Sequence, residues 1–305
     1  MPIHVYTPWR RDYFKDLSCP ADVDIPIDDG DAYRWHPLHR WVYNKLLVAE
    51  SQGLACAPHG VAPTRYPVFS KPIFNLEGMG VGSRLLRDAR EYEAHSTPGH
   101  LWMEWLEGEH VSTDAAVIGG GVHWMRHALG HTLPGGTFDH WIIEASPRDA
   151  HAAYCTDWIT RHLAGYTGMV NLETIGGRII EAHLRFSDQW PDLYGSGWLD
   201  AMVRLYAHAL WDFTDRDRRD GFSLPLFGPH GRSFTHPDPQ TQSRVRAMPS
   251  VSSLQITFHG DRSAASHAMP PGGFRLAVIN CWERAAGVAA RAVLARAFGL
   301  ESPLA

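Results

Sequence analysis

The spacing of apolar residues predicts four helices. Apolar side chains recur on charged or polar backgrounds over residues 41–52, 197–213 and 283–298. This spacing is typical of a helix that packs on one face, with a period of about 3.6 residues. A fourth helix is expected over residues 147–164, with Ser146 as its N-cap and a proline at its first position.

Strands are predicted from short runs of β-branched and aromatic residues that end at glycine or proline. These runs occupy residues 67–72, 101–106, 114–118, 122–125, 169–174, 178–184 and 252–258. Glycines at 119–121 and 176–177 join two pairs of runs, which predicts two hairpins. Residues 1–36 show no clear period, so we expect an irregular arm with a turn at 28–30. The whole pattern predicts an α+β fold, with a domain boundary at the polar stretch 215–220.

Composition narrows the classes of partner. The chain has 305 residues, 44% of them hydrophobic, which is enough to bury a full core. Its net charge of −5 offers no basic field for nucleic acid. No stretch approaches the ~20 apolar residues of a membrane helix, no secretion signal is apparent, and the four cysteines lack CxxC spacing. We therefore expect a cytoplasmic protein with no nucleic-acid or membrane partner.

Lysines and glycines suggest a phosphate site. Lys71 ends a predicted strand, and a loop containing Gly78 and Gly80 follows it. Glycine permits close backbone approach to a phosphate, and the ammonium group supplies a point charge. Lys45, on the preceding predicted helix, offers a second cation, although a solvated helix face explains this residue equally well.

Residues 103–106 combine apolar and aromatic side chains at the end of a predicted strand. An adenine ring needs an apolar slot with backbone groups at its edge, which predicts a hinge at Glu104, Trp105 and Leu106. Glu109 would then face the ribose.

The second predicted hairpin gathers polar residues on one face. Glu181, His183 and Arg185 alternate with apolar neighbours, so strand geometry places all three on the same side. Asn171 and Glu173 share a face of the partner strand. The two strands together predict a metal site, although Arg185 pairing locally with an aspartate is an alternative.

In their order and separation, these motifs resemble the ATP-grasp superfamily, which includes biotin carboxylase, carbamoyl phosphate synthetase and D-alanine ligase. The resemblance covers about residues 41–195. It implies two lobes with antiparallel sheets that clasp ATP, plus a C-terminal α/β extension. The parts would be an N-terminal arm at 1–40, a small lobe with the glycine-rich loop at 41–102, a large lobe at 103–214 and the extension at 215–305.

The resemblance also implies a role for each motif. The two ATP-binding lysines of the superfamily fall on Lys45 and Lys71, and its ribose-binding acid falls on Glu109. Its metal pair falls on Glu181 and His183, and the following arginine, which steadies an acyl-phosphate transition state, falls on Arg185.

This chain departs from the superfamily pattern in three places. Asn171 stands where the first metal acid is expected, with Glu173 as a stand-in, and His183 replaces an asparagine. Imidazole is a poorer ligand than oxygen for Mg²⁺, and Mn²⁺ would tolerate it better. Only 44 residues precede Lys45, the first of the two ATP-binding lysines, where the superfamily has a whole domain.

The resemblance implies an ATP-dependent ligase that joins a small-molecule carboxylate to a nucleophile, with ATP and Mg²⁺ or Mn²⁺ as cofactors. A nucleotide-binding pseudoenzyme or regulatory subunit is the alternative, and a scaffold that binds no nucleotide is a third. Homo-oligomerisation or a partner subunit stays open. Arg275, after a Pro-Pro-Gly-Gly turn, is a candidate clamp for the carboxylate, although a purely structural turn accounts for the motif as well.

Three histidines, His123, His127 and His131, recur every four residues. On a helix they would share a face and suggest zinc. We expect an extended segment, in which positions four apart lie ~13 Å from each other, too far to share an ion.

Overall fold

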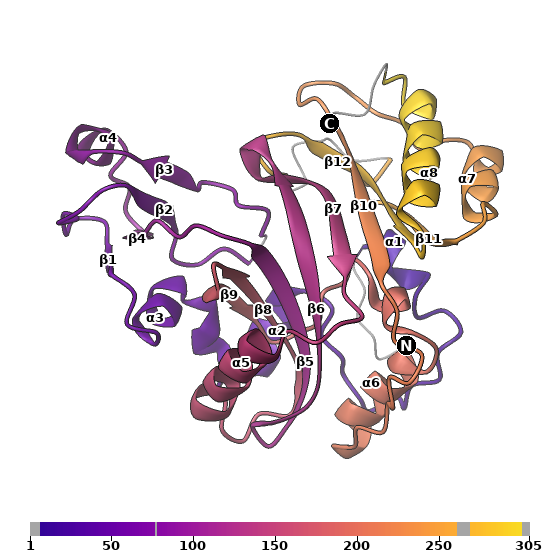
Figure 1. Cartoon of the computed structure of the whole chain (residues 1–305), viewed down its shortest axis with the longest axis horizontal. Coiled ribbons are helices and arrows are strands. Elements are labelled where there is room, and N and C mark those ends of the chain that lie inside the picture. Colours follow the sequence, from indigo (N-terminus) through magenta and orange to yellow (C-terminus); the bar gives the residue numbers. More distant parts are fainter. Residues whose placement is uncertain (1–6, 77, 261–268, 301–305) are drawn as a thin grey trace.

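The computed structural model describes residues 7–76, 78–260 and 269–300 and contains two antiparallel sheets (Figure 1). The small sheet has the strand order β1-β4-β2-β3. Its strands are β1 (Cys56–Pro58), β2 (Val68–Pro72), β3 (Arg84–Leu86) and β4 (His100–Glu104).

The large sheet has the order β11-β12-β10-β7-β6-β5-β8-β9. Its strands are β5 (His110–Ile118), β6 (Gly121–Leu133), β7 (Thr137–Ile143), β8 (Gly168–Ile175), β9 (Arg178–His183), β10 (Gly221–Gly228), β11 (Val251–Ile256) and β12 (Phe274–Cys281).

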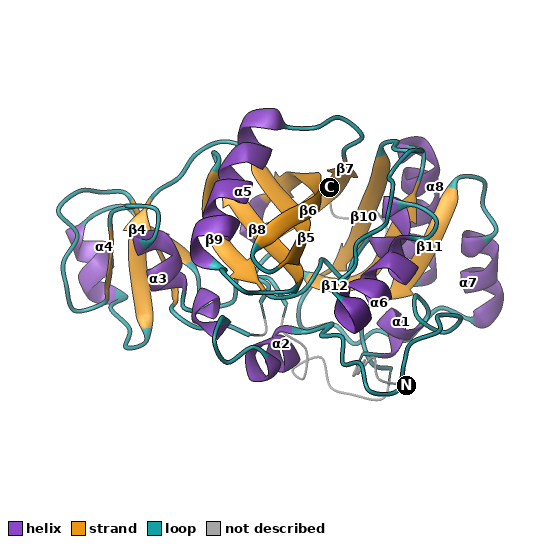
Figure 2. Cartoon of the chain, turned by 90° about the horizontal axis from the view of Figure 1, so that it is seen from below, coloured by secondary structure: helices purple, strands orange, loops and turns teal. Residues whose placement is uncertain are grey.

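The helices lie beside and over these sheets. The α-helices are α1 (Pro8–Arg11), α2 (Asp29–Trp35), α3 (Lys45–Glu50), α4 (Ala89–Ala94), α5 (Asp149–His162), α6 (Trp198–His208), α7 (Pro239–Arg246) and α8 (Arg284–Ala297). The 3₁₀ turns are η1 (Arg40–Tyr43), η2 (Pro134–Gly136) and η3 (Pro191–Tyr194). Figure 2 shows the small sheet with α3 and α4 at one end of the molecule, and α7 and α8 at the other. No helix in the described ranges is long and apolar enough to cross a bilayer.

The two faces of the large sheet pack against different helices. Ala115 and Val117 of β5 belong to a buried cluster with residues of α5, whereas Ala116 belongs to another with residues of α6. Successive side chains of a strand point to opposite faces, which explains this division. The polar residues of β8 and β9 therefore lie on the face opposite α5, where the cavity described below is located.

The predicted strands and helices are confirmed in kind. The predicted helix over residues 41–52 is divided at Asn44, whose extended backbone separates η1 from α3. Three further details are wrong. Helix α5 starts at Asp149 and its N-cap is Arg148, not Ser146, because the backbone of Arg148 is still non-helical, with φ of −107° and ψ of 76°. Helix α6 ends at His208, since Ala209 adopts a left-handed conformation with φ of 50° and reverses the chain.

The third error concerns the predicted turn at 28–30. These residues begin α2, and the Asp28 side chain accepts a hydrogen bond from the Asp31 amide at 2.9 Å. The same side-chain chemistry caps helices and closes turns, so the local sequence does not separate the two.

The expected division into parts stays a prediction. The connection between the small and large sheets runs over residues 105–109. Beyond residues 215–220, β10 pairs with β7 and also with β12, so the C-terminal strands extend the large sheet without a break.

Candidate active site

A cavity of about 1000 Å³ is lined by strands of both sheets. Of the fourteen residues predicted for the site, twelve line it. They are Lys71, Gly78, Gly80, Glu104, Trp105, Leu106, Asn171, Glu173, Glu181, His183, Arg185 and Arg275. Lys45 and Glu109 do not line it.

One end of the cavity has the features expected for an adenine slot. The segment after β4 passes along it, and Phe69, Leu85 and Met103 add apolar surface from the small sheet. The glycine-rich loop borders the same end, and Gly78 and Gly80 both adopt left-handed conformations, with φ of 71° and 64°. A side chain at either glycine would be strained, which explains glycine at these positions.

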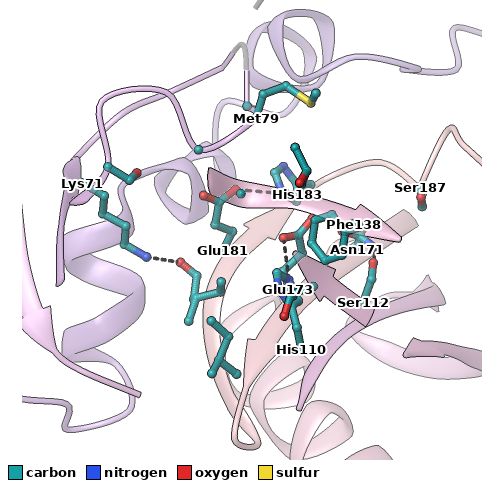
Figure 3. Close-up of a pocket in the computed structure, with 18 of the residues that line it drawn as sticks. Lys71, Met79, His110, Ser112, Phe138, Asn171, Glu173, Glu181, His183 and Ser187 are labelled. Carbon is teal, nitrogen blue, oxygen red and sulfur yellow. Dashed lines mark hydrogen bonds and ion pairs between the residues drawn. The ribbon is translucent and has the colours of Figure 1, made fainter. Parts of the chain in front are cut away.

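The two predicted lysines have different partners. Lys71 is buried, and its Nζ donates to the Ile180 carbonyl at 2.7 Å (Figure 3). Lys45, also buried, forms an ion pair with Glu181 and does not line the cavity. Only Lys71 is therefore placed to meet a ligand directly.

The register of β8 and β9 places the polar residues of the hairpin in cross-strand pairs. Glu173 lies opposite Glu181, and Asn171 lies opposite His183. Glu173 contacts His110 of β5 at 3.2 Å. Figure 3 shows these side chains on one side of the cavity, with Met79 of the glycine-rich loop above them. The predicted clustering of the hairpin residues is therefore observed.

A residue that the sequence analysis missed organises this cluster. Asp29 is 4% exposed and binds the guanidinium of Arg185 through both carboxylate oxygens, to Nε and Nη2, each at 2.8 Å. It also lies 3.0 Å from His183 Nδ1, and His183 Nε2 lies 3.5 Å from Glu181. Lys45, Glu181, His183, Asp29 and Arg185 thus form a chain of alternating charge, which we call the charge chain.

Burial and pairing set the charges of this cluster. Burial opposes the charge on His183, but Asp29 and Glu181 raise its pKa to about 9. Burial likewise opposes ionisation of Glu181, yet Lys45 and His183 hold the pKa of Glu181 well below its ordinary value. Burial lowers the pKa of Lys71 to about 8, because no carboxylate in the described structure pairs with it directly.

The four predicted metal ligands do not fit as one ligand set. Both ring nitrogens of His183 face carboxylates, so neither offers a lone pair to an ion. Glu181 and Glu173 are each paired with a side chain of the protein. Across the described ranges, no three His, Cys, Asp or Glu side chains are arranged to hold a metal ion. Metal binding by Asn171, Glu173 and Glu181 stays a prediction.

The structure places Glu109 outside the cavity, with its side chain 61% exposed and paired with Arg148. Gly108 adopts φ of 121°, and the Gly176 amide donates to the Glu109 carbonyl at 3.0 Å. This backbone leaves Glu107 at the cavity instead.

The three spaced histidines all lie on strand β6, as expected for an extended segment. His127 contacts Thr113 at 3.0 Å, and His131 stacks on His140. His127 and His131 therefore each have a separate partner within the protein.

Comparison with solved structures identifies the fold. The L-amino acid ligase from Bacillus licheniformis superposes with a TM-score of 0.64 at 14% identity, over 93% of this chain and 81% of that one. The carboxyaminoimidazole ribonucleotide synthase from Aspergillus clavatus, complexed with ATP, gives 0.58 at 12%, over 84% and 74%. Phosphoribosylamine–glycine ligase from Thermotoga maritima gives 0.57 at 14%, over 84% and 77%. The chain has the ATP-grasp fold. No family model and no curated protein sequence matches it.

The ATP-grasp fold agrees with the two antiparallel sheets that border the cavity here. At these identities the likeness concerns architecture alone. The roles of individual residues in this chain therefore depend on the geometry described above.

Proposed function

We propose that this ATP-grasp protein is an ATP-dependent ligase that activates a carboxylate as an acyl phosphate. One observation carries the proposal. The hinge and glycine-rich loop of the small-sheet side face Glu173, Glu181 and Arg185 of the large-sheet side across a single cavity. The similarity to solved ligases and synthetases, one of them complexed with ATP, supports it.

In this proposal, adenine lies at the hinge. Phe69, Leu85 and Met103 supply apolar contacts, and the backbone of residues 104–106 meets the edge of the ring. The triphosphate extends past Gly78 and Gly80 toward Lys71, whose unpaired charge it would neutralise.

The reaction would take place in two steps. A carboxylate oxygen attacks the γ-phosphorus, the bond from that phosphorus to the β-phosphate oxygen breaks, and ADP leaves. An amine or similar nucleophile then attacks the acyl carbon, expels inorganic phosphate and releases its proton to the phosphate. Arg185, oriented by Asp29, offsets the charge on the transferred phosphoryl group.

We further propose that any Mg²⁺ or Mn²⁺ arrives with the phosphates of ATP. The charge chain already neutralises Glu181 and occupies His183. A resident ion held by those two residues would have to displace these pairs.

A pseudoenzyme that binds nucleotide without turnover is the second candidate. The placement of His183 within the charge chain favours it, because a metal ligand is expected at that position. The solved neighbours described above are named as ligases or synthetases and lend it no support.

Calorimetric titration of ATP, with Mg²⁺ and then Mn²⁺, tests the nucleotide site. We expect binding to the wild type and to Arg90→Gln, an exposed residue of α4 outside the cavity, and weakened binding to Glu181→Ala. ADP release dependent on a carboxylic acid and an amine then separates the ligase from the pseudoenzyme. No ATP binding to the wild type with either ion would rule out both.

A further inference from the structure

The cavity continues past the hairpin to a second end, away from the hinge. There it is lined by aromatic residues of β7, β10 and the segment before η3, and by the start of β12. We call this region the acceptor end and define it by Phe138, Trp141, Trp190, Phe227 and Arg275.

Three arginines among the described residues line the cavity, and they differ in their partners. Arg10 pairs with Asp188, and Arg185 pairs with Asp29. The Arg275 guanidinium has no hydrogen bond or ion pair with any described residue, and its Nε is buried without a partner. Burial lowers the pKa of Arg275 to about 10, so the group is still charged at neutral pH. The acceptor end therefore has one positive charge that no described carboxylate pairs with directly, although the nearby charge of Asp188 acts on it.

The backbone around Arg275 is held in place. Arg275 lies opposite Phe227 in the pairing of β10 and β12. The turn before it packs against the β6–β7 connection, where the Gly272 amide donates to the Gly135 carbonyl at 2.7 Å. A Cβ atom at Gly135 would come within 2.6 Å of the Gly272 Cα, so the two turns approach each other closely only because both residues are glycine.

The opposite wall is aromatic. The ring centroids of Phe138 and Trp141 are 4.3 Å apart, and those of Trp141 and Trp190 are 5.2 Å apart. Gly130 on the neighbouring strand makes room for them, since a Cβ atom there would lie 2.8 Å from the Phe138 ring. Phe138 and Asn171 both line the cavity. An apolar ligand group at this wall would contact aromatic side chains that are already packed.

We propose that the acceptor end binds an aromatic carboxylic acid, with the carboxylate on Arg275 and the aromatic ring against Phe138 and Trp141. A guanidinium matches a carboxylate through two parallel hydrogen bonds. A phosphate ester, which carries up to two charges, would meet only one unpaired cation here. The role of this acid as a substrate rests on the proposed function, whereas its binding does not.

The test compares four small probes by calorimetric titration, with and without saturating ATP. The probes are 3-phenylpropionate, propionate, 3-phenylpropan-1-ol and ribose 5-phosphate. We expect 3-phenylpropionate to bind at least about tenfold more tightly than each of the others, because only this probe has both the ring and a single carboxylate.

Two substitutions of Arg275 test whether this residue binds the carboxylate of the ligand. Arg275→Gln is expected to weaken binding of 3-phenylpropionate about tenfold or more. A smaller loss is expected for Arg275→Lys, which keeps the positive charge but cannot form two parallel hydrogen bonds with the carboxylate. Arg90→Gln, on exposed α4, is the matched control and is expected to bind as the wild type does. ATP titration of each variant shows whether it is folded. If Arg275→Gln does not fold, Arg275→Lys and the four probes still decide the question.

Two results would overturn the proposal: no binding of 3-phenylpropionate to the wild type, or tighter binding of ribose 5-phosphate. Unchanged binding by a folded Arg275→Gln would do the same. Failure of the proposed function looks different, because the aromatic acid would then bind as expected while ATP fails to bind or ADP is not released.

Discussion

Four of the cations near the cavity form two pairs, which differ in whether a carboxylate of the protein binds them. Lys45 and Arg185 each bind a carboxylate of the protein, Glu181 and Asp29 respectively. Among the described residues, Lys71 donates to a backbone carbonyl alone, and the Arg275 guanidinium has no partner.

The two paired cations stabilise the arrangement of the site, whereas the two unpaired cations are available to bind an anionic ligand. A buried, paired cation stabilises the arrangement of its partner, and removal of the partner leaves the charge uncompensated. A buried cation without a carboxylate is costly in the free protein, and an anionic ligand relieves that cost. Lys71 stands at the proposed nucleotide end and Arg275 at the acceptor end, as expected for two separate anionic ligands.

The largest effect is expected on removing the partner of a paired cation. Asp29→Ala leaves Arg185 and His183 buried without their shared carboxylate. We expect the free energy of unfolding in urea to fall by about 3–5 kcal/mol. Asp28→Ala, the neighbouring N-cap residue, serves as the control and should lose about 0.5–2 kcal/mol. Equal losses in the two variants would show that the charge chain contributes nothing beyond helix capping.

The opposite result is expected for an unpaired cation. Lys71→Met removes a buried charge that has no carboxylate partner, so we expect the free energy of unfolding to change by less than ~1 kcal/mol. ATP affinity should nevertheless fall about tenfold or more, because a phosphate loses its cation. Calorimetry and urea unfolding on the same preparation measure both quantities. A large loss of stability with unchanged ATP affinity would place Lys71 among the structural cations.

As the pH rises, deprotonation of Lys71 should raise the stability of the protein and lower its affinity for ATP. Burial lowers the pKa of Lys71 from 10.5 to about 8 in the folded protein. Between these values the unfolded chain binds more protons, so the contribution of Lys71 to stability rises with pH. ATP binding requires the charged lysine, so affinity should fall by up to about tenfold per pH unit above ~8. Lys71→Arg stays charged and should remove this dependence; a profile shared by both proteins would assign the titration to another group.

The sequence predicts most of the site because the relevant signals are local. Alternation along 178–184 correctly predicts that Glu181 and His183 share a face, and the pairing of two adjacent strands brings Asn171 and Glu173 to them. The glycine-rich loop and hinge are equally local features. Twelve of fourteen predicted residues line the cavity for this reason.

The rest depends on contacts between distant parts of the chain. Asp29 meets Arg185 across 156 positions of sequence, and nothing near Asp29 indicates that partner. The Asp-rich segment around it has the composition of a turn, so its helix and its role were both missed. The aromatic wall at the acceptor end likewise forms only when β7 and the segment before η3 come together.

The smallest effect is expected at Glu109, which the resemblance to the ATP-grasp superfamily predicts to bind the ribose. Glu109 is mostly exposed and paired with Arg148, whereas Glu107 lines the cavity two residues earlier. We expect Glu109→Gln to change stability by less than ~1 kcal/mol and to leave ATP affinity within about twofold, because exposed ion pairs contribute little. Glu107→Gln should weaken ATP binding by about three- to tenfold through loss of a charged acceptor. Calorimetry of ATP with both variants compares them directly. If Glu109→Gln has the larger effect, the hinge must rearrange when nucleotide binds, so that Glu109 reaches the ribose.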